Sequence, residues 1–221
     1  MAVQQFLMMG RAGLDSRNII TGTMWVYGYG GYGVTGLGNT DNVTTPTKLG
    51  TLETWQNTIS PGMIYHNRIA VKSDGTLWSW GLNNSGVGGH GDTTQRSSPV
   101  QVGSLTDWKE VGCNGSVTSA VKTDGTLWTW GYNGTGGLGH NDTTDRSSPV
   151  QVGSATDWEH VIIAPFGQDW SFVMKTNGAL YYAGTVTGQS NVSTFTQVGS
   201  ATGFVDAIAT QNQGIVAWKE A

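Results

Sequence analysis

The chain has 221 residues, among them 34 glycines and 10 tryptophans, and only 12% of its residues are charged. This composition is typical of a turn-rich β protein, and the sequence has no sustained 3.6-residue apolar period that would indicate helices. The net charge of −4 and the absence of any cluster of Lys or Arg argue against a nucleic-acid partner. Cys113 is the single cysteine, which excludes a disulfide within the chain.

Residues 1–21 precede the repetitive part of the sequence and are interpreted as an N-terminal arm. The arm carries a short apolar cluster followed by a basic residue, namely Phe6, Leu7, Met8, Met9 and Arg11. This cluster is too short for a signal-peptide core, and no other segment approaches the roughly 20 apolar residues of a membrane span. We therefore expect a protein made in the cytoplasm without membrane insertion. The arm is expected to dock onto a larger protein assembly; a strap or plug on the protein's own fold, or a frayed tail, are the alternatives.

Residues 22–221 consist of four copies of a repeat of about 50 residues. Gly-Thr-Leu-Trp-x-Trp-Gly occupies 75–81 and 125–131, with weaker copies at 22–28 and 178–184. Ser-Pro-Val-Gln-Val-Gly at 98–103 returns at 148–153, with weaker copies at 45–50 and 194–199. A period of this length in a sequence rich in Gly and Trp predicts an array of small β units.

Each copy contains four short strand candidates, which in one copy are 158–162, 171–175, 179–182 and 195–198. Between the second and third candidates stands Asp74-Gly75, Asp124-Gly125 or Asn177-Gly178, which favours a tight two-residue hairpin turn. Four antiparallel strands per unit predict the blades of a propeller. The expected fold is an all-β propeller of four four-stranded blades.

The central repeats also resemble a known family. Ala-Val-Lys-x-Asp-Gly-Thr-Leu-Trp-x-Trp-Gly-x-Asn-x-x-Gly-x-x-Gly-His-x-Asp-Thr-Thr, closing with Ser-Ser-Pro-Val-Gln-Val, spans 70–102 and 120–152. This pattern is similar to the regulator-of-chromosome-condensation repeat, and the resemblance implies a propeller. The usual ring of that family has seven blades, whereas this chain has material for four.

The two ends of the array predict how the ring closes. Residues 204–221 align with 108–125, so the last repeat breaks off at the point where the first repeat begins. We expect one composite blade, with two strands from 205–208 and 215–219 and two from 24–27 and 47–49. This closure would remove open sheet edges and give a monomeric ring. The alternative is a homo-oligomer in which a second copy completes an eight-bladed ring.

Strand direction divides the connections between two faces. The turn face carries only tight turns. The loop face carries the long connections and the divergent inserts, at 28–45, 81–98, 131–148, 184–194, 59–67, 112–117 and 162–170. Loops displayed by a rigid scaffold are common binding surfaces, so we expect the loop face to bind the partner.

Several residues of the loop face are candidates for ligand contact. His90 and His140 are followed two residues later by Asp92 and Asp142, a pattern that could suggest a metal site. No loop offers the second imidazole that such a site needs, so we interpret the two histidines as loop-organising hydrogen-bond partners. The pairs of tryptophans at 78/80 and 128/130 are interpreted as packing between blades. Aromatic residues outside the repeat pattern are the better candidates, with packing over the ring as the alternative. The predicted binding residues are Tyr29, Tyr32, Tyr65, His66, His90, Tyr132, His140, Phe166 and Trp170.

The sequence gives no support for catalysis. It contains no Gly-x-Ser-x-Gly, His-Glu-x-x-His or Gly-x-x-x-x-Gly-Lys pattern, and no helix follows its Gly-rich loops. We therefore expect neither an enzyme nor a cofactor nor a metal site.

Two functional classes follow from these features. A short propeller with near-identical repeats, an N-terminal tether and no export signal is similar to structural proteins of bacteriophages. This similarity predicts a virion protein of the tail or capsid surface that contributes to host attachment, with a host-surface glycan or protein bound at the loop face. The alternative is an intracellular protein-binding regulator that promotes nucleotide exchange on a GTPase or inhibits an enzyme.

Overall fold

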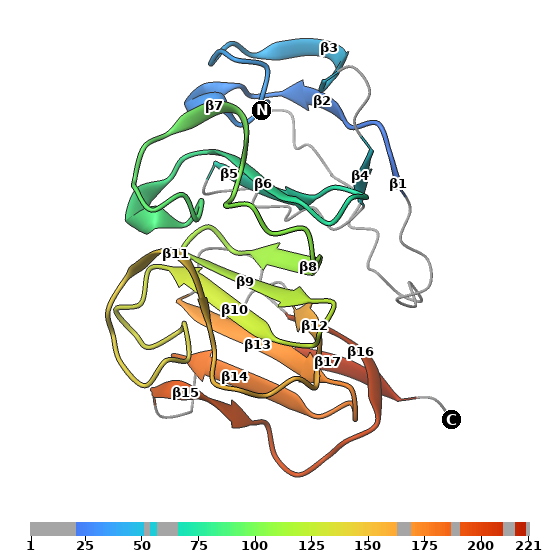
Figure 1. Cartoon of the computed structure of the whole chain (residues 1–221), viewed down its shortest axis with the longest axis vertical. Helices are drawn as coiled ribbons and strands as arrows, with labels where there is room; N and C mark the ends of the chain where they lie inside the picture. The colour runs from blue at the N-terminus through green and yellow to red at the C-terminus, as the bar shows by residue number, and fades with distance from the viewer. Residues whose placement is uncertain are drawn as a thin grey trace, which may run out of the picture.

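The computed structural model describes residues 21–50, 54–56, 66–162, 169–186, 191–209 and 215–219. Within these ranges the chain forms β-strands and two short 3-10 turns, η1 (Gly31–Gly33) and η2 (Asn84–Gly86). The strands form antiparallel sheets that follow one another along the molecule, as blades (Figure 1). The predicted arm up to residue 20, and the candidate residues Tyr65 and Phe166, lie outside the described residues.

Two complete blades, the third and the fourth, lie between the second blade and the C-terminal end of the array. Each is a four-stranded sheet in which neighbours in sequence pair antiparallel. The strands of the third blade are β8 (Trp108–Cys113), β9 (Val117–Lys122), β10 (Leu127–Gly131) and β11 (Arg146–Gln151). The strands of the fourth blade are β12 (Trp158–Ile162), β13 (Trp170–Lys175), β14 (Leu180–Gly184) and β15 (Val192–Gln197). These blades confirm the predicted all-β fold and its unit of four strands.

The second blade has a shorter first strand. Its main sheet consists of β5 (Asn67–Val71), β6 (Leu77–Gly81) and β7 (Arg96–Gln101). The two-residue strand β4 (Trp55–Gln56) joins it through a single bridge between Trp55 and Lys72. β4 also pairs with β1 (Thr21–Gly22), in which Thr21 lies opposite Gln56. Thr21, which the sequence placed in the arm, is therefore part of the array.

A half blade lies at each end of the described array. The N-terminal half blade is β2 (Trp25–Gly28) with β3 (Val43–Lys48), and the C-terminal half blade is β16 (Phe204–Ala209) with β17 (Ile215–Lys219). They are separate two-stranded sheets in opposite halves of the molecule (Figure 1), so the predicted composite blade is not formed within the chain. The described strands therefore form an open arc of blades and not a closed ring.

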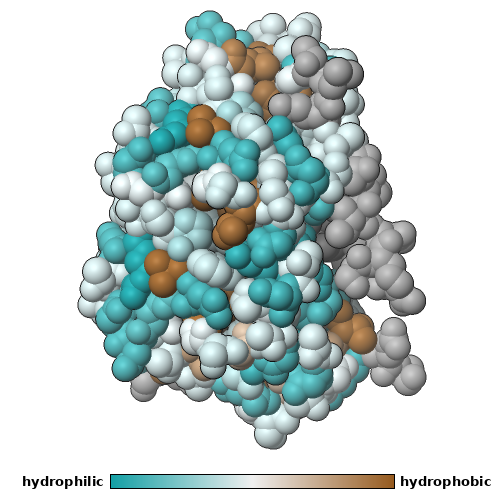
Figure 2. All heavy atoms as spheres, viewed as in Figure 1, coloured by the Kyte–Doolittle hydropathy of each residue, from teal (hydrophilic) through white to brown (hydrophobic). Residues whose placement is uncertain are grey.

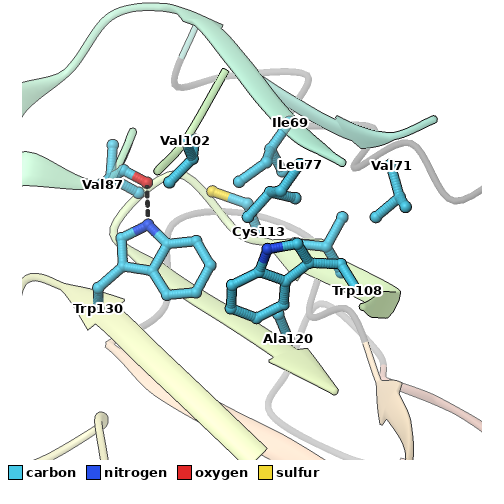
Figure 3. Close-up of a cluster of buried hydrophobic side chains, with 10 residues drawn as sticks. Ile69, Val71, Leu77, Val87, Val102, Trp108, Cys113, Ala120 and Trp130 are labelled. Carbon is cyan, nitrogen blue, oxygen red and sulfur yellow. Dashed lines mark hydrogen bonds between the residues drawn. The ribbon is translucent and has the colours of Figure 1, made fainter. Parts of the chain in front are cut away.

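The hydrophobic core lies between the blades. Side chains of the second blade, such as Ile69 and Leu77, pack against Trp108, Cys113 and Trp130 of the third blade (Figure 3). The Trp130 indole Nε1 donates to the Val87 carbonyl at 2.9 Å, and the Trp80 Nε1 repeats this bond to the Val34 carbonyl at 3.0 Å. Trp130 is fully buried, which confirms the prediction that these tryptophans pack between blades.

The hairpin turns of the turn face differ in type from the prediction. The Gly75 amide donates to the Lys72 carbonyl and the Lys72 amide to the Thr76 carbonyl, so the loop contains three residues, 73–75. Of these three residues, Gly75 alone has a positive φ, +77°. The Asp74 carboxylate accepts hydrogen bonds from the Thr76 amide and hydroxyl, at 3.0 and 2.6 Å. Asp therefore stabilises the turn through its side chain, and Gly supplies the left-handed residue of a turn with a bulge.

Candidate binding face

The long loop of the third blade, 131–148, is held by a buried amide at its centre. The Asn133 side chain is fully buried, accepts a hydrogen bond from the Leu138 amide at 3.0 Å and donates to the Asp142 carbonyl at 3.0 Å. Arg146 donates two hydrogen bonds to the Asp142 carboxylate, at 3.0 and 2.7 Å. The loop is thus fixed by side-chain hydrogen bonds, although it has no regular secondary structure over most of its length.

The equivalent loop of the second blade, 81–98, has the same network. Asn83 accepts from the Gly88 amide at 2.6 Å and donates to the Asp92 carbonyl at 2.9 Å. Arg96 again binds the Asp92 carboxylate with two bonds, at 3.0 and 2.9 Å. Hydrogen bonds from Arg96 hold the pKa of Asp92 well below its usual range, and those from Arg146 do the same for Asp142. Both loops therefore display their exposed residues from a fixed backbone.

The two candidate histidines belong to this network. The ring Nε2 of His90 lies 2.8 Å from the Ser79 hydroxyl, and that of His140 lies 2.9 Å from the Thr129 hydroxyl. Burial lowers the pKa of His90 to about 4 and shifts the pKa of His140 in the same direction, so both imidazoles are neutral at pH 7. This geometry confirms that they organise the loops. No group of three or more potential metal-ligating side chains occurs among the residues that the structure describes.

Three backbone positions on the loop face recur in successive repeats. The first follows the glycine that ends the third strand of a blade and is occupied by Tyr29, Leu82 and Tyr132. The second position has a positive φ inside the short 3-10 turn and is occupied by Tyr32 and Ser85. The third position precedes the second strand of a blade and is occupied by His66, Ser116 and Asp169. The backbone links two of these positions directly, because the Leu82 amide donates to the His66 carbonyl and the Tyr132 amide to the Ser116 carbonyl.

Where the three positions first occur along the chain, they are occupied by Tyr29, Tyr32 and His66, which together form the aromatic cluster. The Tyr32 ring stacks on the His66 ring with centroids 4.7 Å apart, and the Tyr29 ring lies 5.3 Å from His66. Tyr29 is 56% exposed and Tyr32 42%. The structure thus brings together three of the predicted binding residues.

The equivalent positions of the next two repeats line a hollow of about 260 Å³. Tyr132 contributes one wall, and the loops of the second, third and fourth blades contribute the others. The lining residues are Leu82, Asn84, Ser85, Val87, Gly115, Ser116, Tyr132 and Asp169. Partial burial raises the pKa of Asp169, and the nearby charge of Asp145 acts in the same direction. Apart from Tyr132, the sequence reasoning missed this hollow, although equivalent repeat positions with different side chains were a signal that could have found it.

Trp170 is not part of this face. It is 1% exposed and packs edge-on against Phe172 in the core between the fourth blade and the C-terminal half blade. Its prediction as an accessible binding residue was wrong, because Trp170 begins β13 and does not belong to the insert before it.

The successive antiparallel blades, with tight turns on one face and displayed loops on the other, define a β-propeller with a candidate binding face. Residues 74–121 and 124–173 match the family model of the Regulator of chromosome condensation (RCC1) repeat. The match of these two segments to the RCC1 repeat confirms the resemblance found in the sequence. No helix in the described part of the chain is long and apolar enough to cross a membrane.

The similar proteins are larger than this chain. Over 92 residues the chain is 36% identical to the Ultraviolet-B receptor UVR8 of Arabidopsis thaliana, a match that spans 41% of this chain and 20% of UVR8. The crystal structure of human WBSCR16 superposes with a TM-score of 0.73 at 19% identity, covering 90% of this chain and 54% of WBSCR16. The structure of Prp20p from Saccharomyces cerevisiae gives a TM-score of 0.64 at 16% identity, over 83% of this chain and 46% of Prp20p. At these identities the two structures show the shared fold alone.

Proposed function

We propose that this protein is a non-catalytic binding propeller that holds another protein on its loop face. The observation that carries the proposal is the contrast between a retained loop scaffold and variable exposed positions. Asn83, His90, Asp92 and Arg96 recur as Asn133, His140, Asp142 and Arg146 in the next loop, with the same hydrogen bonds. The three recurring positions, in contrast, carry different side chains along the array: Tyr29, Leu82 and Tyr132 at the first, Tyr32 and Ser85 at the second, and His66, Ser116 and Asp169 at the third. A rigid scaffold with variable display positions is typical of a recognition surface.

The chemistry of the exposed positions indicates a partner with basic and apolar groups. Tyrosines supply large contact areas with little loss of side-chain entropy, and they are enriched in protein interfaces. Asp169 supplies a carboxylate at the hollow, and Asp145 adds a second negative charge near it. We therefore expect a protein segment that places a Lys or Arg side chain at Asp169 and packs against Tyr132.

Tyr32 adds an argument from backbone strain. Its φ of +60° lies in the left-handed region, which costs a residue other than glycine about 1–2 kcal/mol. The side chain at this strained position is exposed and stacks on His66, so the fold gains little packing from it. A tyrosine held in this conformation at the surface supports a binding role.

The relatives support the general class of this function and not its finer form. The structure of Prp20p is described together with its binding properties to Gsp1p and histones, so a propeller of this fold can bind proteins. A virion location and host attachment stay predictions that these relatives do not support, and the alternative regulator role stays open beside them. Because residues 1–20 lie outside the described residues, docking of the arm also remains a prediction, to be tested by deleting them and measuring incorporation into particles.

The test compares the loop face with the turn face. The purified protein is probed with an array of peptides that vary in charge and aromatic content. We expect basic peptides to bind and acidic ones not to bind, and the combined substitutions Tyr132→Ala and Asp169→Asn to weaken binding at least 10-fold. Leu105→Ala is the matched control, because Leu105 is 41% exposed on the turn face. Equal binding by the loop-face variant, or equal loss in the control, would contradict the proposal.

A further inference from the structure

Each half blade presents an apolar surface that the complete blades keep buried. In the N-terminal half blade, Trp25 is 60% exposed and Tyr27 59%, whereas Trp130, which occupies the position of Tyr27, is fully buried. In the C-terminal half blade, Ile208, Val216 and Trp218 are between 39% and 48% exposed. Large apolar side chains gathered on two strands mark an interaction surface.

The two surfaces correspond to opposite faces of one blade. Val26 of β2 and Met24, which precedes this strand, pack against the core of the second blade. Trp25 and Tyr27 therefore lie on the face where a preceding blade would be. Phe204 and Ala207 point from the C-terminal half blade toward the fourth blade, which leaves Ile208 and Val216 on the face where a following blade would lie. Within the described part of the chain, each half blade therefore has no neighbouring blade on the side where the other half blade already has one.

The strands of the two half blades are also complementary. β16 and β17 pair as β8 and β9 do, with Lys219 opposite Phe204 as Lys122 is opposite Trp108. β2 and β3 pair as β10 and β11 do, including the register shift before the terminal glycine. The C-terminal half blade thus contains the first two strands of a blade, and the N-terminal half blade contains the last two. Lys219 takes the place of Lys122, which corrects the sequence alignment by one residue in β17.

We propose that β17 of one copy pairs with β2 of a second copy, so that two arcs close into one ring through two composite blades. The pairing of β9 with β10 sets the register, which places Ala217 opposite Trp25, Val216 opposite Val26 and Ile215 opposite Tyr27. This arrangement covers the exposed apolar side chains of both half blades and pairs an edge of each strand. Open edges and apolar patches are otherwise prone to unspecific association.

The share of longer propellers that this chain covers favours two copies over closure within one chain. The superposition with WBSCR16 covers 90% of this chain and 54% of WBSCR16, and that with Prp20p covers 83% of this chain and 46% of Prp20p. The arc of this chain therefore corresponds to about half of a longer propeller. Two half rings related by a twofold axis meet end to end and close after two copies. The inference does not depend on the proposed function, because the loop face lies outside the pairing strands.

The first experiment measures the mass of the full chain in solution by light scattering. We expect twice the chain mass of 23.4 kDa. Val216→Lys places a charge in the composite blade and should raise the dissociation constant of the dimer at least 100-fold, whereas Val150→Lys, at an exposed position of the outer strand β11, should not. Circular dichroism controls for the fold of each variant. A monomeric wild-type protein, or a mass that grows with concentration beyond two copies, would overturn the proposal.

The second experiment tests the register directly. Directly opposite residues of paired strands have Cβ atoms about 4.5–5.5 Å apart, so a cysteine pair there can form a disulfide on oxidation. Val26→Cys combined with Val216→Cys should give a covalent dimer on a non-reducing gel, and Val216→Cys alone should give none. A disulfide within one chain would show closure in cis, and a dimer without the cross-link would show another interface. Either outcome would refute the pairing of β17 of one copy with β2 of a second copy.

Discussion

The turn face and the loop face use the same repeat in opposite ways. On the turn face the second, third and fourth blades share one arrangement, in which a lysine lies over aromatic rings of the first and third strands. In the third blade the Lys122 Nζ lies 5.1 Å from the centroid of the Trp108 ring and 4.3 Å from that of the Trp128 ring. Lys72 and Lys175 repeat this arrangement in the second and fourth blades. On the loop face the scaffold recurs while the exposed residues differ. The turn face therefore repeats one packing arrangement within each of these blades, and the loop face is free to vary for recognition.

The largest effect is expected where two blades touch on the turn face. In Gly125→Ala, the added methyl group would meet the backbone carbonyl of Thr156 at the start of the next blade, and φ at this position is +78°. We expect the free energy of unfolding to fall by about 3 kcal/mol or more, because neither backbone segment can move without opening the blade interface. Chemical denaturation measures the change.

A matched glycine separates the two causes of this loss. Gly153 also has a positive φ, +56°, but a methyl group there would have no heavy atom within 4 Å. Gly153→Ala should therefore cost only the backbone term, about 1 kcal/mol. Equal losses at Gly125 and Gly153 would show that the approach of Thr156 contributes nothing.

A somewhat smaller loss is expected at the centre of the loop scaffold. Asn133→Ala leaves the Leu138 amide and the Asp142 carbonyl without the side-chain partner that each now has, in a fully buried place. The free energy of unfolding should fall by about 2–4 kcal/mol, and the Leu138 amide should lose its protection from hydrogen exchange.

The first-repeat loop provides the control for this substitution. Asn42 is exposed and accepts one hydrogen bond, from the Gly30 amide at 3.0 Å. Asn42→Ala should cost no more than about 1 kcal/mol. A comparable loss at both positions would contradict the view that the middle loops are fixed more firmly than the first one.

The sequence predicted the units of this fold better than their closure. Periodicity, the Asp-Gly turns and the Trp pairs predicted the blades because those features depend on short-range geometry and on burial between neighbours. The angle between blades depends instead on how side chains such as Trp130 and Val87 fit across an interface, which no strand pattern encodes. The open arc therefore had to come from the structure.

The candidate site was predicted in part for a similar reason. Exposed aromatics were singled out as unusual, and Tyr29, Tyr32 and His66 do lie together. Asp169 and Ser116 line the hollow but have ordinary side chains, so they become visible only when each repeat is compared with the next at the same backbone position. Trp170 was predicted as the last residue of the insert 162–170, whereas β13 begins at this residue.

The loop histidines predict a dependence of stability on pH. Burial lowers the pKa of His90 to about 4, while an unfolded histidine titrates near 6.5. Below pH 6.5 the unfolded state therefore binds more protons than the folded one, so stability falls as the pH is lowered from about 6.5 toward 4. His90→Gln should reduce this slope in chemical denaturation between pH 7 and 4, and the double variant with His140→Gln should reduce it further. The carboxylates Asp92 and Asp142 contribute only below about pH 4, because their pKa values are lowered from 3.8. An unchanged slope in the double variant would exclude the histidines as its source.

The smallest effect, and the one of opposite sign, is expected at the display position itself. Tyr32 has a φ of +60°, which glycine adopts without strain, so Tyr32→Gly relieves about 1–2 kcal/mol of backbone strain. Glycine also gives the unfolded chain more conformational entropy, and this destabilising effect is slightly smaller than the strain that is relieved. The free energy of unfolding should rise by about 0.5 kcal/mol, although a large aromatic side chain is removed. Ser85→Gly, at the equivalent position with a φ of +56°, should give a similar gain without loss of any aromatic contact. If Tyr32→Gly instead destabilises the protein by more than about 1 kcal/mol, the stacking on His66 holds the loop together and Tyr32 belongs to the scaffold. If stability rises while peptide binding at the loop face weakens, this position retains a strained tyrosine for recognition. The loop face would then give up stability for binding, whereas the turn face does not.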